Sequence, residues 1–302
     1  MNATMPRTIA DYLEQLRAAL QGADPALIQD ALYDAEDHLR SELAENPDKS
    51  EAEMLAKIAS SYGAPDEVAA IYVDKEHQVQ QALRSPPPPP RTSTLGRFFG
   101  VAADARAYSA LFYMLLALPT GIFYFVWAVT GISLSIGLSI LIFGIAFAVL
   151  FIATVRVLSL VEGRIIEVML GERMPRRPLY SNANKPLRAR VAEMFTDPRT
   201  WSTLLYMLLR LPLGIFYFTI AVTGVTTSLA LIFAPIAVML SELGVIDGGL
   251  RFDGEPYVPP MITAPIAFLL GVVLLFGMLH LARCVGHLHG ALAKHFLVKS
   301  AA

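Results

Sequence analysis

The hydrophobic residues follow two different patterns along the chain. Between residues 8 and 84, apolar side chains recur every three or four positions, which predicts about four amphipathic helices. Between Ala107 and Val155, 49 consecutive residues include no Asp, Glu, Lys, Arg or His. About 20 residues suffice for one membrane-spanning helix, so this run predicts two crossings, with a turn near Thr130 and Gly131. The pattern predicts an all-α protein, in which a soluble N-terminal helical module precedes a polytopic membrane domain.

Helix start and stop signals divide the N-terminal part. Asp24 before Pro25 predicts an N-cap with proline at the first helical position. Ser50 and Glu53 have the spacing of a capping box, which predicts the start of a short third helix. Pro65 is expected to begin the fourth helix.

The membrane part contains an internal repeat. Residues 104–131 align without gaps to residues 197–224, and 19 of the 28 positions are identical. A second alignment pairs the stretch from Arg156 with the stretch from Arg283, so the second repeat carries an insertion of 34 residues. The domains expected are a module (1–84), a proline-rich linker (85–96), membrane repeat 1 (97–196) and membrane repeat 2 (197–302) with a polar external loop (241–260).

Two segments of this membrane part are less regular. Val225–Leu240 is an uncharged stretch of 16 residues, which is marginal for a crossing, and we expect an interrupted or re-entrant segment there beside four spanning helices. After each repeat, Leu158–Leu170 and Val285–Val298 are amphipathic and suited to a membrane interface.

Charge predicts how the chain is oriented. The segment 156–199 holds nine Lys or Arg against five acids, whereas the loop 241–260 holds one base against four acids. Basic segments stay in the cytoplasm. We therefore expect a multi-pass protein of the bacterial inner membrane, with the acidic loop outside and the N- and C-termini in the cytoplasm.

The module itself is strongly acidic. Residues 1–84 hold 16 acids and 7 bases, a net charge of −9, whereas the remainder carries +7. Asp30, Asp34 and Asp37, with the adjacent His38, lie on the outer face of the second predicted helix. Two interpretations stay open: a solvated helix surface, or a docking face for a basic partner.

The module resembles the HAAS helical signalling domain of bacterial membrane proteins. The resemblance rests on IADYLEQLRAAL at 9–20, YDAEDHLRSEL at 33–43 and YGAPDEVAAIY at 62–72. It implies a cytoplasmic signalling role with a PadR-like winged-helix regulator as partner. The five prolines at 86–90 form a spacer after it.

The membrane half resembles the sensor domain family of bacterial membrane proteins, over about residues 97–298. The residues that carry this resemblance are D-x-R-x-W-x-x-L-L-Y at 197–206, LP-x-G at 118–121 and 211–214, and LHGALA at 288–293. Such domains commonly precede histidine kinases. No ATP-binding domain follows in this sequence, so the kinase output is not carried over.

Five residues of the predicted spans are candidates for a hinge or switch. Pro119 and Pro212 each remove a backbone hydrogen bond at equivalent depth in the two repeats. Each is followed two residues later by a glycine, Gly121 or Gly214. A static kink that lets helices pack is the alternative. Arg210 places a charge in a predicted span. Its side chain either has a function there or extends along the helix to the membrane interface.

Other polar residues give weaker signals. His280, Cys284 and His287 share one helix stripe, but they are spread too far along the helix for one ion, so no metal and no cofactor is expected. A signal could be received by the charged residues of the external loop, although a plain connector is the simpler interpretation. These candidate residues are Asp247, Arg251, Asp253 and Glu255.

The sequence therefore favours a membrane-embedded sensor that relays a signal to a cytoplasmic partner. It contains no catalytic constellation and no DNA-binding motif, so we expect neither an enzyme nor direct binding to nucleic acid. The expected partners are the lipid bilayer and a PadR-like regulator, and homo-oligomerisation stays open. The alternative is a transporter or an accessory subunit of one. The predicted spans contain no acidic residue, which counts against this alternative. An intramembrane enzyme ranks third.

Overall fold

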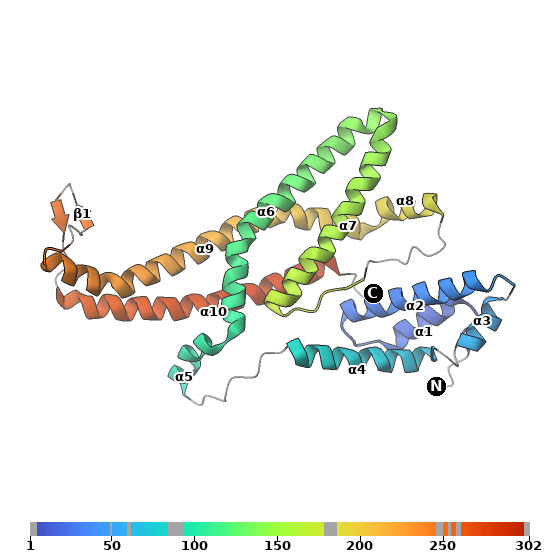
Figure 1. The fold of residues 1–302 in the computed structure, drawn as a ribbon, viewed down its shortest axis with the longest axis horizontal. Helices are drawn as coiled ribbons and strands as arrows, with labels where there is room; N and C mark the ends of the chain where they lie inside the picture. The colour runs from blue at the N-terminus through green and yellow to red at the C-terminus, as the bar shows by residue number, and fades with distance from the viewer. Residues whose placement is uncertain are drawn as a thin grey trace. The chain divides into compact units, whose positions relative to one another are not determined.

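The structure is a computed structural model of the chain. It describes residues 5–48, 50–58, 62–83, 93–177, 186–245, 250–252, 255–257 and 261–298. These residues are largely helical (Figure 1). The chain divides into two compact units: one combines residues 1–84, 124–209 and 289–302, and the other combines residues 85–123 and 210–288.

The N-terminal module consists of α1 (Ile9–Ala19), α2 (Pro25–Glu45), α3 (Glu51–Ile58) and α4 (Pro65–Leu83). Its core is built from all four helices, and residues such as Leu16 and Leu39 are completely buried in it. The expected caps are confirmed, because the Asp24 side chain accepts from a backbone N–H of α2 and Ser50 and Glu53 exchange two hydrogen bonds. Since this core needs no residue from elsewhere, the module has the basis to fold by itself.

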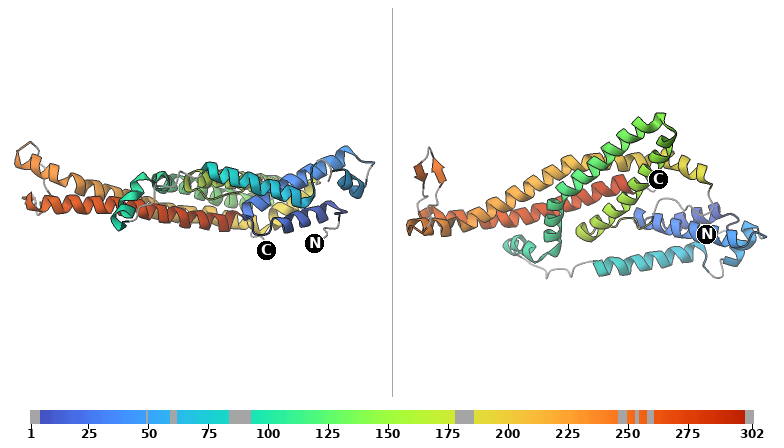
Figure 2. Two further views of the ribbon diagram at one scale, coloured as in Figure 1. Left: turned by 90° about the horizontal axis from the view of Figure 1, so that it is seen from below. Right: turned by 45° about the horizontal axis from the view of Figure 1, so that its top comes forward.

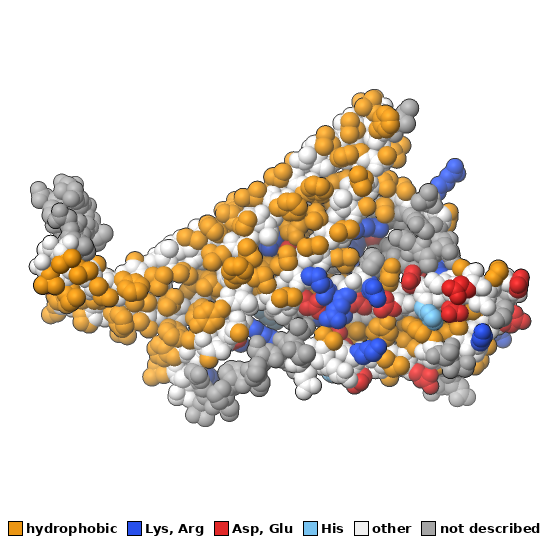
Figure 3. Space-filling model, in the orientation of Figure 1, with side chains coloured by type: hydrophobic (Ala, Val, Ile, Leu, Met, Phe, Trp, Pro, Cys, Tyr) orange, Lys and Arg blue, Asp and Glu red, His pale blue; other side chains and the backbone are white. Residues whose placement is uncertain are grey.

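Among the described residues, four apolar helices are long enough to span a membrane: α6 (Ala105–Gly137), α7 (Ile142–Leu170), α9 (Pro198–Glu242) and α10 (Ala264–Leu297). Hydrophobic side chains cover them in the space-filling view (Figure 3). Many of these side chains are exposed, which suits contact with lipid. The remaining helical pieces are α5 (Thr94–Phe99), α8 (Leu187–Thr196) and three 3-10 turns at Gly100–Ala103, Leu138–Ile140 and Met261–Thr263. The four spans define a multi-pass membrane protein.

The repeated segments begin their helices in the same way. α6 and α9 start 93 residues apart, the offset of the sequence repeat. Asp104 and Asp197 each accept a hydrogen bond of 3.0 Å from the backbone N–H two residues later. In one unit Arg283 pairs with Asp104 at 3.2 Å, and in the other Arg156 pairs with Asp197 at 3.5 Å. Each repeat thus supplies an arginine to the aspartate that begins the other repeat's first helix.

The turn between the first two spans differs from the expectation. α6 continues through Thr130 and Gly131, and the chain reverses at the 3-10 turn Leu138–Ile140. A Cβ at Gly131 would lie 1.9 Å from the Phe151 ring of α7. The glycine therefore serves helix packing, which the sequence pattern does not distinguish from a turn.

The interruption expected in Val225–Leu240 is not found. This segment lies within the single 45-residue helix α9, which contains both Pro212 and Pro235. Gly271 of α10 allows close packing there, because a Cβ at this position would lie 2.8 Å from the Ser228 carbonyl oxygen. α9 and α10 accordingly run side by side in all views (Figures 1 and 2). The amphipathic stretches 158–170 and 285–298 likewise belong to α7 and α10, apart from Val298, and form no separate helices.

A small hairpin joins α9 to α10. β1 (Leu250–Phe252) pairs antiparallel with β2 (Glu255–Tyr257) in the segment expected to be an external loop. Of the candidate signal residues, Arg251 lies in β1 and Glu255 in β2. Asp247 and Asp253 lie outside the described residues.

Candidate functional site

A basic segment that follows α7, which we call the arm (residues 171–177), reaches the N-terminal module. Gly171 ends α7 in the left-handed conformation, with φ of 76°, so the chain leaves the helix axis there. Two further glycines make room for the arm. A Cβ at Gly163 would contact Met174 at 3.3 Å, and one at Gly290 would lie 2.4 Å from Glu172. The arm is thus packed against α7 and the end of α10.

Arg173 of the arm binds three carboxylates from three helices. Its Nη2 donates to Asp30 of α2 at 2.7 Å, and its Nε donates to Glu76 of α4 at 3.0 Å. Its Nη1 lies 3.6 Å from Glu167 of α7. All four side chains are at most 8 % exposed. We call these four residues the arginine clamp.

Asp30 is the acceptor that fixes the arm's backbone. Its Oδ1 accepts hydrogen bonds from the backbone N–H groups of Arg176 and Arg177 at 2.7 and 2.8 Å. Burial raises the pKa of the Asp30 carboxyl, although Arg173 and these two N–H groups act in the opposite direction. The carboxylate therefore depends on the arm to remain charged in a site that water does not reach.

Contacts at the edge of the clamp extend this attachment. Arg177 pairs with Asp34 at 2.7 Å, and Arg176 pairs with Glu167 at 3.1 Å. Asp34 also accepts from the Tyr72 hydroxyl at 3.0 Å. Burial, and then the charge of Asp34, raises the pKa of Tyr72, so this hydroxyl keeps its proton and donates. Lys294 in the last turn of α10 pairs with Asp24, the N-cap of α2.

Of the four residues expected on a docking face, Asp30 and Asp34 contact the arm. His38 instead stacks on Tyr62 within the module, with ring centroids 4.5 Å apart. Asp37 is half-buried, and its carbonyl accepts from Ser41. Whether these residues bind a partner protein remains a prediction.

The clamp residues Arg173, Glu76 and Glu167 were missed by the sequence analysis. The available signal was the run of arginines at 173, 176 and 177 shortly after the predicted amphipathic stretch Leu158–Leu170.

The five hinge or switch candidates lie together at a crossing of α6 and α9. A Cβ at Gly121 would lie 2.6 Å from the carbonyl oxygen of Arg210, and one at Gly214 would lie 2.3 Å from that of Ala117. These two contacts are equivalent in the repeats, because residues 117 and 210 are 93 positions apart. The helices continue through Pro119 and Pro212. Each LP-x-G glycine therefore allows the backbones to approach closely.

Arg210 is completely buried at this crossing and does not snorkel. Its guanidinium carbon lies 4.8 Å from the centre of the Tyr113 ring, and its Nη2 donates to Thr120 Oγ1 at 3.2 Å. Both partners belong to α6. The aromatic face and the hydroxyl acceptor both stabilise a charge that is otherwise costly in a membrane helix.

A second buried polar group lies in the stretch Leu158–Leu170, which was expected to be an amphipathic segment at the membrane interface. Glu162 of α7 is buried and accepts from the Tyr206 hydroxyl at 3.0 Å, and this hydroxyl also lies 3.1 Å from Nε2 of His289. Because α7 extends to Leu170, the span Phe143–Leu170 does contain acidic residues. These acids lie beyond the uncharged run Ala107–Val155, in the part of α7 that was expected at the membrane interface.

The histidine stripe of α10 shows ordinary contacts. His280 Nε2 lies 3.0 Å from the carbonyl oxygen of Phe98, and the two rings stack. Cys284 is exposed. Within the described residues, no three His, Cys, Asp or Glu side chains gather in a way that would hold a metal ion.

The fold and these contacts define a class: a multi-pass helical membrane protein with a soluble helical module attached to it by buried ion pairs. Comparison with known families agrees. The family described as "Putative sensor" matches residues 113–297, and the HAAS family matches residues 11–71. The chain belongs to this sensor family and carries a HAAS domain N-terminal to it. Neither family is enzymatic. No curated protein and no solved structure matches the chain.

Proposed function

We propose that this membrane sensor regulates access to the acidic face of its HAAS module, and that a basic cytoplasmic protein, a PadR-like regulator, binds this face. The observation that carries the proposal is the arginine clamp. The arm places Arg173 and Arg177 on Asp30 and Asp34, which a basic partner would otherwise engage. The arm and the partner then compete for the same carboxylates.

Signal transfer follows from the position of the arm. The arm begins at Gly171, the residue that directly follows α7, so a shift or rotation of α7 moves Arg173 directly. Glu167, which also binds Arg173, lies in the last turn of the same helix. A change sensed by the spans would weaken the clamp, release the acidic face and let it capture the regulator, in competition with DNA.

A transporter, or an accessory subunit of one, is the second candidate. It is favoured by Glu162, a buried acid in a span with Tyr206 and His289 beside it, since intramembrane acids often carry protons or ions. Reconstituted vesicles distinguish the two. A pH- or ion-driven flux that Glu162→Gln abolishes would support transport and would count against a sensor role.

The orientation in the inner membrane is tested by cysteine labelling. In a Cys284→Ser background, we place one cysteine at Val245, after α9, or at Arg188, in α8; both side chains are exposed. An impermeant maleimide added to intact cells should label position 245 and leave position 188 unlabelled until the membrane is permeabilised. The reverse pattern would place the module outside the cytoplasm and refute the proposal.

Partner binding is tested with the isolated module, residues 1–84. Its charge of −9 predicts that it binds the regulator encoded beside its gene, and that salt weakens this binding because charged surfaces are screened. Asp30→Asn with Asp34→Asn should lower the affinity at least tenfold, whereas Glu14→Gln on the exposed face of α1 should leave it almost unchanged. A well-folded module that shows no heat of binding at low salt would contradict the proposed partner.

A further inference from the structure

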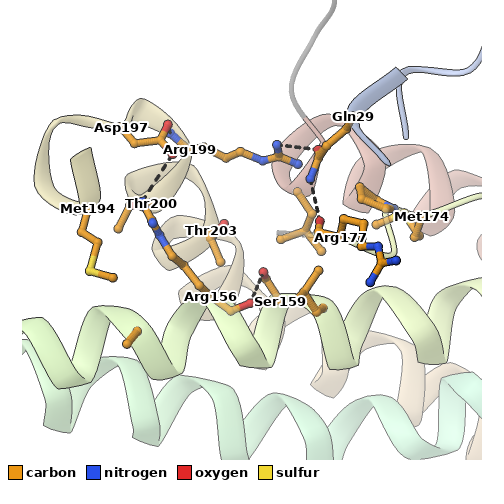
Figure 4. Close-up of a pocket in the computed structure, with 14 residues that line it drawn as sticks. Gln29, Arg156, Ser159, Met174, Arg177, Met194, Asp197, Arg199, Thr200 and Thr203 are labelled. Carbon is orange, nitrogen blue, oxygen red and sulfur yellow. Dashed lines mark hydrogen bonds and ion pairs between the residues drawn. The ribbon is translucent and has the colours of Figure 1, made fainter. Parts of the chain in front are cut away.

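A cavity of about 200 Å³ lies beside the arm, in the unit that also holds the clamp. Its polar lining comes from α2, α7, the arm and the start of α9, and the residues face one another across the space (Figure 4). The main contributors are Gln29, Arg156, Arg177, Asp197, Arg199 and Thr200.

The lining carries more positive than negative charge. Arg156, Arg177 and Arg199 line the cavity with one carboxylate, that of Asp197, and the Arg177 guanidinium also pairs with Asp34 at 2.7 Å. Arginine presents a planar set of N–H donors that fits phosphate oxygens in pairs. The cavity also lies at the N-terminus of α9, where the helix dipole favours an anion. Charge and donor geometry both select a phosphate group.

Two of these arginines contact other polar residues of the cavity wall. Arg199 Nη1 donates at 2.8 Å to Oε1 of Gln29, which is a neutral amide and a poorer acceptor than a phosphate oxygen. Arg156 lies 3.5 Å from Asp197 and donates to the Thr200 hydroxyl at 3.3 Å, near the upper limit for a hydrogen bond. A phosphate oxygen bound in the cavity would compete with these contacts.

Part of the wall is apolar. Ala153, Leu160, Met174, Met194 and Leu297 also line the cavity. Ala153 and Leu160 belong to a membrane span, so the wall is continuous with a surface that contacts lipid. Such a wall suits the uncharged part of a phosphate ester.

We propose that this cavity binds a phosphate ester, either the headgroup of an anionic phospholipid or a soluble phosphate compound. The effect of this binding on the module rests on the proposed function. Gln29 joins the module to this cavity, since it accepts from Arg199 and donates to the Arg177 carbonyl at 3.0 Å. A ligand that binds the Arg199 guanidinium removes its contact with Gln29 of the module. By linkage, release of the module then strengthens ligand binding.

The test uses the full chain in nanodiscs and has two arms. In the first, nanodiscs contain phosphatidylcholine with or without phosphatidylglycerol, and native mass spectrometry counts the lipids that the protein retains after the nanodisc is removed. In the second, phosphatidylcholine nanodiscs receive glycerol 3-phosphate or inorganic phosphate, and calorimetry measures binding. Retention only in the first arm assigns the lipid headgroup, and heat only in the second assigns a soluble ligand.

The variants decide whether the cavity is the site. Arg156→Gln with Arg199→Gln should lower affinity for the binding probe at least tenfold, and Arg199→Lys should restore part of it. Arg188→Gln, an exposed arginine outside the cavity, is the control and should change affinity less than twofold. The proposal is overturned if wild type binds neither probe, or if Arg188→Gln weakens binding as much as the double variant. None of these readouts involves the regulator, so failure here leaves partner binding to its own test.

Discussion

Arg173→Met should detach the arm from the module and cost about 3–5 kcal/mol, because it leaves Asp30, Glu76 and Glu167 as buried carboxylates without their shared cation. A loss of this size raises the population of the detached state more than 100-fold. The module should stay folded, since its hydrophobic core lies entirely within α1–α4. Detachment is therefore the expected result, and unfolding of the module is not.

Hydrogen exchange measures this effect at two defined amides. The backbone N–H groups of Arg176 and Arg177 donate to Asp30, so their protection should fall about 100-fold or more in Arg173→Met. Arg40→Met is the matched control. It removes a partly buried i,i+4 pair with Glu36 within α2, and such helix pairs are worth about 0.3–0.5 kcal/mol. Unchanged protection in Arg173→Met, or an equal loss in the control, would show that the clamp does not hold the arm.

Gly214→Ala should destabilise the crossing of α6 and α9 by about 1–3 kcal/mol, which is the usual cost of overpacking. The new Cβ would lie 2.3 Å from the carbonyl oxygen of Ala117, and a backbone atom cannot rotate away as a flexible side chain can. Gly121→Ala should act similarly through the Arg210 carbonyl. The double variant should cost less than the sum, since both changes open the same contact.

Gly277→Ala provides the control for this crossing. Gly277 also lies inside a membrane helix, but a Cβ there would meet nothing within 4 Å. Its replacement should be neutral or slightly stabilising, because alanine favours a helix by up to about 1 kcal/mol over glycine. Thermal unfolding in detergent compares the three variants. If Gly277→Ala lowers the midpoint as far as Gly214→Ala, the close approach of the helices is not what these glycines provide.

Local signals made the module and the spans predictable. Asp24 before Pro25, and Ser50 with Glu53, lie next to the backbone groups that they cap, so the sequence contains the whole interaction. Length and hydropathy likewise identified the spans. Glycine was harder to interpret, because a turn and a close helix contact both require a small residue. Gly131 was expected in a turn and serves packing against Phe151.

The clamp was not predictable because its partners are distant in the sequence. Asp30 and Arg173 are separated by 143 positions, and neither residue type indicates that the two meet. Arg210 presents the same difficulty. Its burial depends on Tyr113 and Thr120 of another helix, and these become neighbours only through the glycines that let α6 and α9 cross closely.

Competition between the arm and the partner is the central claim, and one measurement tests it most directly. The affinity of the basic regulator is measured by fluorescence anisotropy for the full chain in nanodiscs, as wild type and as Arg173→Met. The clamp predicts that wild type binds at least tenfold more weakly than the isolated module, and that Arg173→Met restores the affinity of the module. Equal affinity of the wild-type and Arg173→Met chains would contradict the account.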